Sequence, residues 1–159
     1  MTISATVQRY LQGRGVPYDV ITHPLTGSSS ETAQSAHVSG GRIAKTVVLR
    51  VGDAADGYLL AVLPASHHLS LELLQRWLGR SVELASEQEI GKLFPDCDLG
   101  AIPPFGEAYG LDAAIDDGLA GLAEVCFEGG DHRTLIKIAG DDFRQLMAGA
   151  RHGRFSKHD

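Results

Sequence analysis

The sequence predicts a single α+β domain of mixed α/β character, in which helices flank a mixed, mostly antiparallel central sheet. Helical and strand-like patterns alternate along 159 residues, a length that suits one domain. Several strand-like runs are joined by links too short for helical crossovers, which favours hairpins. No repeat, low-complexity block or linker divides the chain. We therefore expect one domain over residues 1–150 and a mobile polar tail over residues 151–159.

The first forty residues predict a helix, a strand and a second helix. Apolar residues recur at helical spacing over residues 3–12, and Gly13 then ends the helix. Residues 18–23 alternate like a short strand. Ser28 and Glu31 have capping-box spacing, so a short helix should follow to about His37.

The middle of the chain predicts a hairpin and two capped helices. The apolar runs "KTVVLRV" and "GYLLAVLP" are separated by "GDAADG", a link that suits a hairpin. An amphipathic helix begins at Ser70 in "LSLELLQRWLG". Ser86 and Glu89 form a second capping-box pattern.

The last third predicts a second strand pair and a closing helix. "LAEVCFEGG" and "TLIKIAG" have the composition of strands and are joined by a short polar turn. "DDFRQLMAG" then predicts a helix with Asp141 near its N-terminus.

Composition excludes several classes of protein. The formal net charge of −6 argues against a general polyanion binder, so a nucleic-acid contact would need a local basic patch and would be weak and salt-sensitive. Cys97 and Cys126 form no CxxC motif and imply no disulfide framework, which favours a reducing cytoplasm. We see no signal peptide and no apolar run of about 18 residues, so we expect a cytoplasmic protein without a membrane partner.

The usual catalytic motifs are missing. The chain has no GxSxG, no GxGxxG between a strand and a helix, and no phosphate-binding loop of the GxxxxGK type. The acidic neighbours of Cys97 disfavour a thiolate, and Cys126 lies inside an apolar strand pattern, so both cysteines are expected to be structural. Because His67 and His68 are adjacent, their side chains diverge, and we expect no metal site.

Lys45 opens a β-branched, strand-like run directly after Gly40-Gly41. One interpretation is a charge that flanks a strand and stays in water. The other is an ammonium that the strand end presents to a cleft. The residue pattern alone leaves both open.

The loop "DLGAIPPFG" is apolar yet rich in Gly and Pro. Gly100 permits a close backbone approach, and Pro103-Pro104 stiffens the loop, so its N–H groups could stabilise an oxyanion. The alternative is a rigid structural loop that packs Phe105 on the core. His132, beside the Gly129-Gly130 turn, is equally compatible with a surface turn and with the lining of a cleft.

Three segments resemble the YbaK family of aminoacyl-tRNA deacylases, a domain also inserted in bacterial prolyl-tRNA synthetases. They are "HPLTGSSSETAQSAHVSGGRIAKTVVLRV", the loop "GAIPPFG" and the late segment "VCFEGGDHRTLIKIAGDDFRQLM". The resemblance spans roughly residues 15–148. Some members carry Asn directly after the lysine, where this chain has Thr46.

The resemblance implies a trans-editing hydrolase that deacylates mischarged aminoacyl-tRNA, with Lys45 facing the cleft near the tRNA 3′ end. We expect a small acyl group, no metal and no cofactor. The partners would be the 3′ end of aminoacyl-tRNA and, as a further candidate, a synthetase, but not DNA. Two alternatives stay open: a non-catalytic tRNA- or synthetase-binding module of the same fold, and a hydrolase of another small ester.

The expected site residues fall into two groups. The expected catalytic residues are Lys45, Gly100 and Ala101, the last two through their backbone amides. The expected substrate-binding residues are Thr46, Ile102, Pro103, Phe105, Gly129, Gly130 and His132.

Overall fold

The structure, a computed structural model, describes residues 3–24, 33, 38–52 and 57–159. Its strands are β1 (Asp19–Thr22), β2 (Ile43–Val51), β3 (Tyr58–Pro64), β4 (His67–Leu69), β5 (Val82–Leu84), β6 (Asp112–Asp116), β7 (Glu124–Glu128), β8 (Thr134–Ala139), β9 (Arg151–Gly153) and β10 (Ser156–His158). Its α-helices are α1 (Ala5–Gly13), α3 (Leu71–Leu78), α4 (Glu87–Leu93) and α5 (Gly140–Leu146), and short 3₁₀ turns are η1 (Gly40–Arg42), η2 (Gly106–Tyr109) and η3 (Asp117–Leu119).

Eight strands form one mixed sheet. Its order is β1-β8-β7-β2-β3-β6-β9, and β5 pairs with β2 off this path. Three neighbouring pairs are parallel (β2 with β7, β3 with β6, β6 with β9), and the others are antiparallel. A separate two-stranded ribbon joins β4 to β10. The predicted fold class, an α+β domain with a mixed, mostly antiparallel sheet, is confirmed.

The predicted hairpin is the antiparallel pair β2–β3, in which Ala44 lies opposite Pro64 and Arg50 lies opposite Tyr58. The late strand pair is β7–β8, also antiparallel. Helix α3 begins after Ser70, whose side chain accepts a hydrogen bond from the Leu73 amide, as the sequence predicts.

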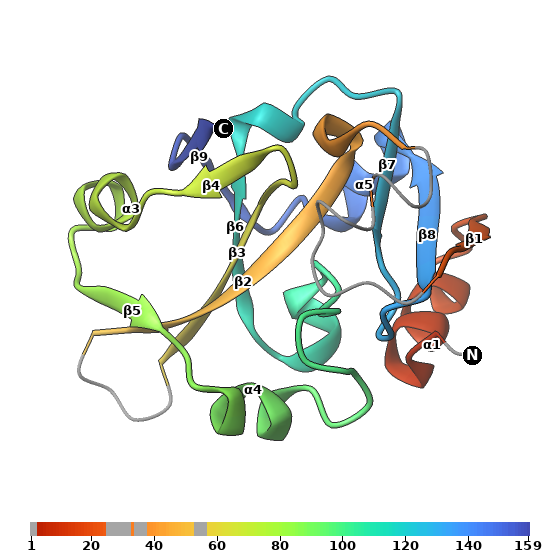
Figure 1. Ribbon diagram of the computed structural model, residues 1–159, viewed down its shortest axis with the longest axis horizontal. Coiled ribbons are helices and arrows are strands. Elements are labelled where there is room, and N and C mark those ends of the chain that lie inside the picture. Colours follow the sequence, from red (N-terminus) through yellow and green to blue (C-terminus); the bar gives the residue numbers. More distant parts are fainter. Residues whose placement is uncertain (1–2, 25–32, 34–37, 53–56) are drawn as a thin grey trace.

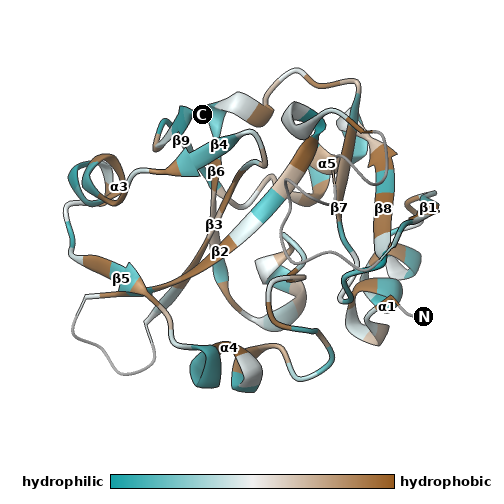
Figure 2. Ribbon diagram, viewed as in Figure 1, coloured by the Kyte–Doolittle hydropathy of each residue, from teal (hydrophilic) through white to brown (hydrophobic). Residues whose placement is uncertain are grey.

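Both faces of the sheet are covered by helices. On one face, Val7 and Leu11 of α1 and Phe143 and Leu146 of α5 join a buried cluster with Phe105 and Phe127. On the other face, α3 packs through Leu74 against Leu49, Leu63 and the fully buried Phe155. Figure 2 shows the long strands largely brown and β4 and β9 teal. Figure 1 shows α4 at the opposite end of the molecule from β9.

The C-terminal segment differs from its prediction. Residues 151–159, expected as a mobile polar tail, carry β9 and β10. Strand β9 pairs with β6, and β10 pairs with β4. Phe155, between the two strands, has no exposed surface. Burial of this one aromatic ring explains why a segment that is otherwise polar is held against the rest of the domain.

Three further differences concern short elements. Strands β4, β5 and β6 are not predicted from the sequence, because strands of three to five residues carry little periodicity. The predicted helix from Ser28 to about His37 falls, apart from Ala33, outside the described residues. Within the described ranges, the helices are too short and too polar to cross a membrane.

Candidate active site

Lys45 lies where the sheet divides. Strand β2 pairs with β7 only at Ile43–Cys126 and Ala44–Phe127. Lys45 and Thr46 follow immediately, and beyond them the two strands diverge (Figure 1). Lys45 is therefore the first residue of β2 beyond its short pairing with β7, near the start of the strand.

The ammonium of Lys45 is half-buried and held by the backbone. Nζ donates a hydrogen bond to the carbonyl oxygen of His67 at the start of β4. Burial lowers the pKa of Lys45 below its ordinary value, and the nearby carboxylate of Asp159 opposes that shift. The first interpretation of Lys45 is a charge that flanks the strand and stays in water. A half-buried ammonium bonded to a backbone carbonyl does not fit that interpretation.

Thr46 points to the other face of the sheet, because successive strand residues alternate. Its Oγ1 is buried and has no hydrogen-bond partner among the described residues. An unpaired buried hydroxyl is unusual in a folded protein. Ala44 and Val48, on the same face as Thr46, pack with the residues of the 98–106 loop.

The loop at residues 98–106 is anchored at its start. The Asp98 amide donates to the Gly130 carbonyl oxygen at 2.7 Å, and the Ala101 amide donates to Asp98 O at 3.1 Å. Because the Ala101 N–H is used in this turn, the expectation that it points at a substrate oxyanion is not met in this conformation. Gly100 has φ +83° and is exposed, and its N–H has no acceptor within the part of the chain that the structure describes.

The apolar residues of this loop pack inward. Ile102 joins Val48, Leu60 and Phe94, and Phe105 stacks near Tyr10 and Phe127 with ring centroids 5.3 and 4.9 Å away. Pro103 is buried too. This placement matches the alternative of a rigid structural loop for these three residues, rather than the expected role as pocket walls.

The turn after β7 lies against the loop. Nε2 of His132 is 2.5 Å from the Leu99 carbonyl oxygen, and a side-chain carbon at Gly100 would come within 3.0 Å of its Cε1. Since a carbonyl only accepts, Nε2 carries the proton, and in the neutral ring Nδ1 is then an acceptor. His132 thus contacts the 98–106 loop, and the choice between a surface turn and the lining of a cleft stays a prediction.

The two glycines of this turn have a packing role. A side chain on Gly129 would meet Ile136, and one on Gly130, where φ is +114°, would meet Ser4 at the start of α1. The Ser4 amide also donates to Gly129 O at 2.6 Å. The structure therefore brings together Gly100, Gly129, Gly130 and His132, whereas no described contact joins Lys45 to this group.

A carboxylate ties the loop to α1. Asp96 accepts hydrogen bonds from Ser4 Oγ at 2.6 Å, from the Thr6 amide at 3.0 Å and from the Tyr109 hydroxyl at 2.9 Å. Burial disfavours the charge, but these bonds outweigh it and hold the pKa of Asp96 below its ordinary value. The residues before Gly100 are thus fixed on the fold.

The cysteines are poor nucleophiles, as predicted. Burial raises the pKa of Cys97 to about 11 and that of Cys126 to about 11, so neither is a thiolate near neutrality. No group of three or more potential metal ligands occurs among the described residues.

The surroundings of Lys45 are not predictable from the local sequence. His67, Asp159 and the ribbon β4–β10 meet there. The only sequence signal was the density of His and Lys in "SHHLS" and "SKHD". By itself, that signal indicates a diverging His pair and a polar tail.

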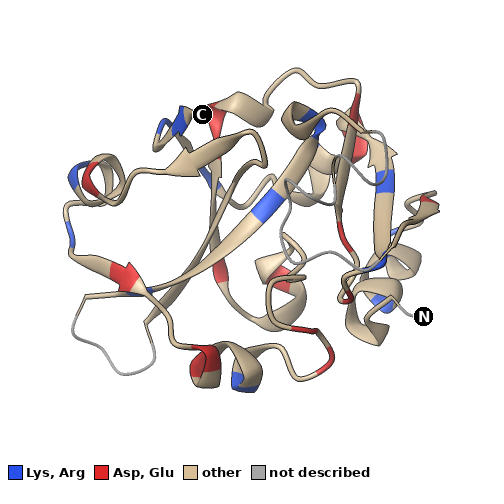
Figure 3. Cartoon of the chain, viewed as in Figure 1, with Lys and Arg blue, Asp and Glu red and all other residues tan. Residues whose placement is uncertain are grey.

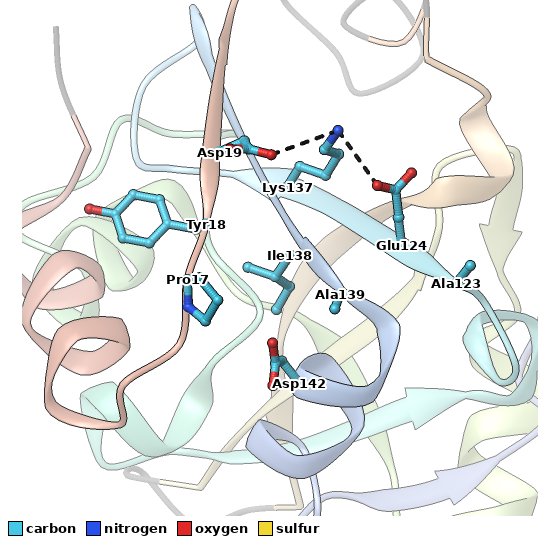
Figure 4. Close-up of a pocket in the computed structure, with 9 residues that line it drawn as sticks. All are labelled: Pro17, Tyr18, Asp19, Ala123, Glu124, Lys137, Ile138, Ala139 and Asp142. Carbon is cyan, nitrogen blue, oxygen red and sulfur yellow. Dashed lines mark ion pairs between the residues drawn. The ribbon is translucent and has the colours of Figure 1, made fainter.

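Figure 4 shows a surface pocket away from these residues, formed by β1, β7, β8 and α5. Lys137 pairs there with Asp19 at 3.9 Å and with Glu124 at 3.5 Å, and Asp142 adds a third carboxylate. The pocket contains none of the predicted site residues. Its excess of negative charge makes it unsuitable for a phosphate.

Comparisons with known proteins identify the family. A family model described as an aminoacyl-tRNA editing domain matches residues 23–146. No curated protein matches significantly. The chain superposes with a TM-score of 0.81 on a solved structure of a proposed trans-editing enzyme for prolyl tRNA synthetase, at 26% identity over 98% of this chain and 99% of that chain.

Two further structures are similar. One comes from a study of epitope backbone grafting onto scaffold proteins by computational design (TM-score 0.82, 27% identity, 97% of each chain covered). The other is a hypothetical protein (TM-score 0.81, 22% identity, 96% of this chain and 99% of that chain covered), which supports the fold alone. The family match covers more than half of the chain, including Lys45 and the 98–106 loop, and the chain belongs to the aminoacyl-tRNA editing domains of the YbaK type.

Proposed function

We propose that this protein is a cytoplasmic trans-editing hydrolase that deacylates tRNA mischarged with a small amino acid. The observation that carries the proposal is the half-buried Lys45 ammonium at the division of β2 and β7 in a chain of the editing family. A half-buried lysine is retained at some cost in stability, which fits a functional role better than a structural one.

The proposed reaction is hydrolysis of the ester between the amino acid and the terminal ribose. Water attacks the ester carbonyl and forms a tetrahedral oxyanion. Collapse breaks the bond to the ribose oxygen, which takes a proton, and releases amino acid and tRNA. A vicinal ribose hydroxyl of the substrate would orient the water.

Lys45 and the loop would have separate roles, since the Lys45 side chain lies on the opposite face of β2 from the residues that pack with the loop. The ammonium would hold the terminal phosphate or ribose and so fix the ester. The Gly100 N–H is the better placed of the two expected oxyanion donors, because that of Ala101 is already used. One such donor contributes about 2.7–4 kcal/mol to transition-state stabilisation in other enzymes.

The acyl preference is proposed to be for Ala or Ser. A size sieve needs only a pocket too small for the cognate residue. Nδ1 of His132 would accept a hydrogen bond from a hydroxylated side chain and so favour Ser. Ile102 and Phe105 would not contact the acyl group but would support the loop from the core.

A deacylation assay with tRNAs charged with Ala, Ser, Thr, Pro and Cys tests the proposal. We expect turnover of Ala- or Ser-tRNA, and a loss of roughly 10²-fold in Lys45→Ala, since misplaced substrates commonly lose that much. Lys92→Ala, an exposed cation on α4, is the matched control and should keep full activity. In His132→Ala, the Ser-to-Ala ratio should fall.

The outcomes separate the alternatives. Full activity in a folded Lys45→Ala protein would refute the assignment of Lys45. A preference for Pro or another larger residue would refute the small pocket. Binding of tRNA without turnover would favour a binding module, and turnover of free esters regardless of tRNA would favour a general hydrolase.

A further inference from the structure

Positive charge is concentrated at the C-terminal end of the chain. Residues 150–159 hold three Lys or Arg and one Asp, a net +2, whereas residues 1–149 hold 11 Lys or Arg and 19 Asp or Glu, a net −8. Four of the seven histidines lie in β4, β9 and β10: His67, His68, His152 and His158. Figure 3 shows Lys or Arg at the end of the molecule where β9 lies.

This basic segment is fixed on the fold. The Phe155 amide donates to Asp116 Oδ1 at 2.9 Å, and the other oxygen of that buried carboxylate accepts from the Gly118 amide at 2.9 Å. The Phe155 ring lies 5.8 Å from that of Trp77. The backbone that carries the cations on either side of Phe155 is therefore held in place before binding, and only their side chains would have to be ordered.

Two of these cations are free to bind an anion. Arg154 and Lys157 are exposed, and neither forms an ion pair with any residue in the described ranges. Elsewhere on the surface, Arg14, Arg76 and Arg144 each meet a carboxylate within 3 Å, whereas Arg9 and Lys92, like Arg154 and Lys157, form no ion pair within the described ranges. The C-terminal cations thus keep their charge available for a partner.

The basic segment is continuous with Lys45. Lys157 lies opposite His68 across the β4–β10 ribbon, and Lys45 donates to the carbonyl oxygen of His67, the residue before. Asp159 lies between His68 and Lys45. Its carboxylate is 2.8 Å from Nδ1 of His68 and close enough to Lys45 to stabilise the ammonium. A chain of contacts therefore leads from Lys45 through His67 and His68 to Lys157, and Arg154 lies three residues before Lys157 in the same segment.

We infer that the C-terminal segment is an RNA-binding surface, on which Arg154 and Lys157 contact backbone phosphates of the acceptor stem of a tRNA. The inference rests on the proposed function, since a tRNA whose 3′ end lies at Lys45 must run over an adjoining surface. The Figure 4 pocket, with three carboxylates and one lysine, would repel the same phosphates.

RNA fits this surface better than a lipid membrane does. Exposed large apolar side chains among the described residues are Val20, Leu84 and Leu99, and none of them is on β4, β9 or β10. Stable membrane binding needs apolar insertion or a polybasic cluster of about 4–8 cations, and residues 150–159 hold three.

The test is binding of uncharged tRNA by fluorescence anisotropy at one low salt concentration. We expect the double variant Arg154→Ala/Lys157→Ala to bind about tenfold more weakly than the wild type, because two phosphate contacts are lost. The matched control is Arg9→Ala/Lys92→Ala, which removes one Arg and one Lys from α1 and α4. Circular dichroism should show that all proteins are folded.

Binding and hydrolysis are scored separately. Equal affinities of the two double variants, or no binding by the wild type, would overturn the RNA surface whatever the deacylation assay shows. A specific loss in Arg154→Ala/Lys157→Ala without any hydrolysis by the wild type would keep the surface and refute the proposed enzyme. Binding to phosphatidylserine vesicles in place of tRNA would also overturn the inference.

Discussion

At the scale of single residues, the candidate site depends on a glycine that touches a histidine. Gly100 has φ +83°, a conformation that costs other residues roughly 1–2 kcal/mol. A methyl group there would also press on the His132 ring at 3.0 Å. The positive φ and the close contact with His132 therefore both favour glycine at this position, and each can be tested by its own measurement.

Gly100→Ala should therefore lower the free energy of unfolding and also displace His132. Gly110→Ala is the control, because Gly110 has a similar φ of +71° but open space around it. Gly110→Ala should lose roughly 1 kcal/mol by denaturant unfolding and Gly100→Ala more than that, and only Gly100→Ala should shift the NMR signals of His132. Unchanged His132 signals in a folded Gly100→Ala protein would contradict the contact.

At the scale of elements, the ribbon β4–β10 depends on one aromatic anchor. Phe155 is fully buried between α3 and β6 residues and separates two exposed polar strands. We expect Phe155→Ala to lower the free energy of unfolding by about 3–5 kcal/mol, the usual loss for a buried Phe. Leu84→Ala, at a site 63% exposed, should change it by less than about 0.5 kcal/mol.

The measurement is urea unfolding of both variants. A Phe155→Ala protein as stable as the Leu84→Ala protein would show that residues 151–159 are a loose tail, as their composition alone suggests. Loss of Phe155 should also weaken tRNA binding, because it releases the cations from their arrangement.

In helix α4, the capping residue Glu89 also contacts side chains of the central sheet. Ser86 and Glu89 form the predicted capping box, and Glu89 also contacts Tyr58 of β3 and lies 3.3 Å from Arg50 of β2. The Tyr58 hydroxyl and the Ser86 amide lower the pKa of Glu89 from 4.5 to about 2. The folded state therefore binds fewer protons here than the unfolded state, and the stabilisation is complete above pH 4.5.

As the pH falls from 4.5 to about 2, this stabilisation should be lost. Glu89→Gln should flatten the decline of the unfolding free energy over that window, measured by denaturant unfolding at a series of pH values. Glu87→Gln, in the first turn of the same helix, removes a carboxylate without the contacts to Tyr58 and Arg50, and its decline should match that of the wild type. A decline in Glu89→Gln as steep as in the wild type would exclude Glu89 as its source.

At the scale of the whole molecule, an acidic protein must bind a polyanion through a small surface. The net charge of −6 opposes RNA, and the inferred surface offers few cations. Each phosphate contact contributes a slope of about −0.7 to −0.9 to the logarithm of the affinity against the logarithm of salt concentration. For two or three contacts we expect a total slope of about −2, and the double variant Arg154→Ala/Lys157→Ala, with at most one contact left, should have a slope between 0 and about −0.9.

Anisotropy titrations of uncharged tRNA between about 50 and 200 mM salt measure this slope. Tight wild-type binding that stays unchanged across the series would contradict both the small electrostatic surface and the expectation from composition.

The sequence by itself determined the fold class, the main helices and strand pairs, and the family. Hydrophobic periodicity and capping residues such as Ser70, Ser86 and Glu89 are local signals, and local signals survive in a single sequence. It also singled out Lys45 and the loop at Gly100, because a cation in an apolar run and glycines beside prolines are locally unusual.

Only the tertiary structure decided what these residues touch. The Ala101 amide was expected to face a substrate but is used by Asp98, and Phe105 was expected in a pocket wall but packs near Phe127. Residues 151–159 look like a tail because their one large apolar residue, Phe155, finds its partners about 80 residues earlier, on α3. Contacts between distant segments leave no periodic trace in the sequence, so the site's neighbours and the ribbon beside Lys45 emerged only once the chain was folded.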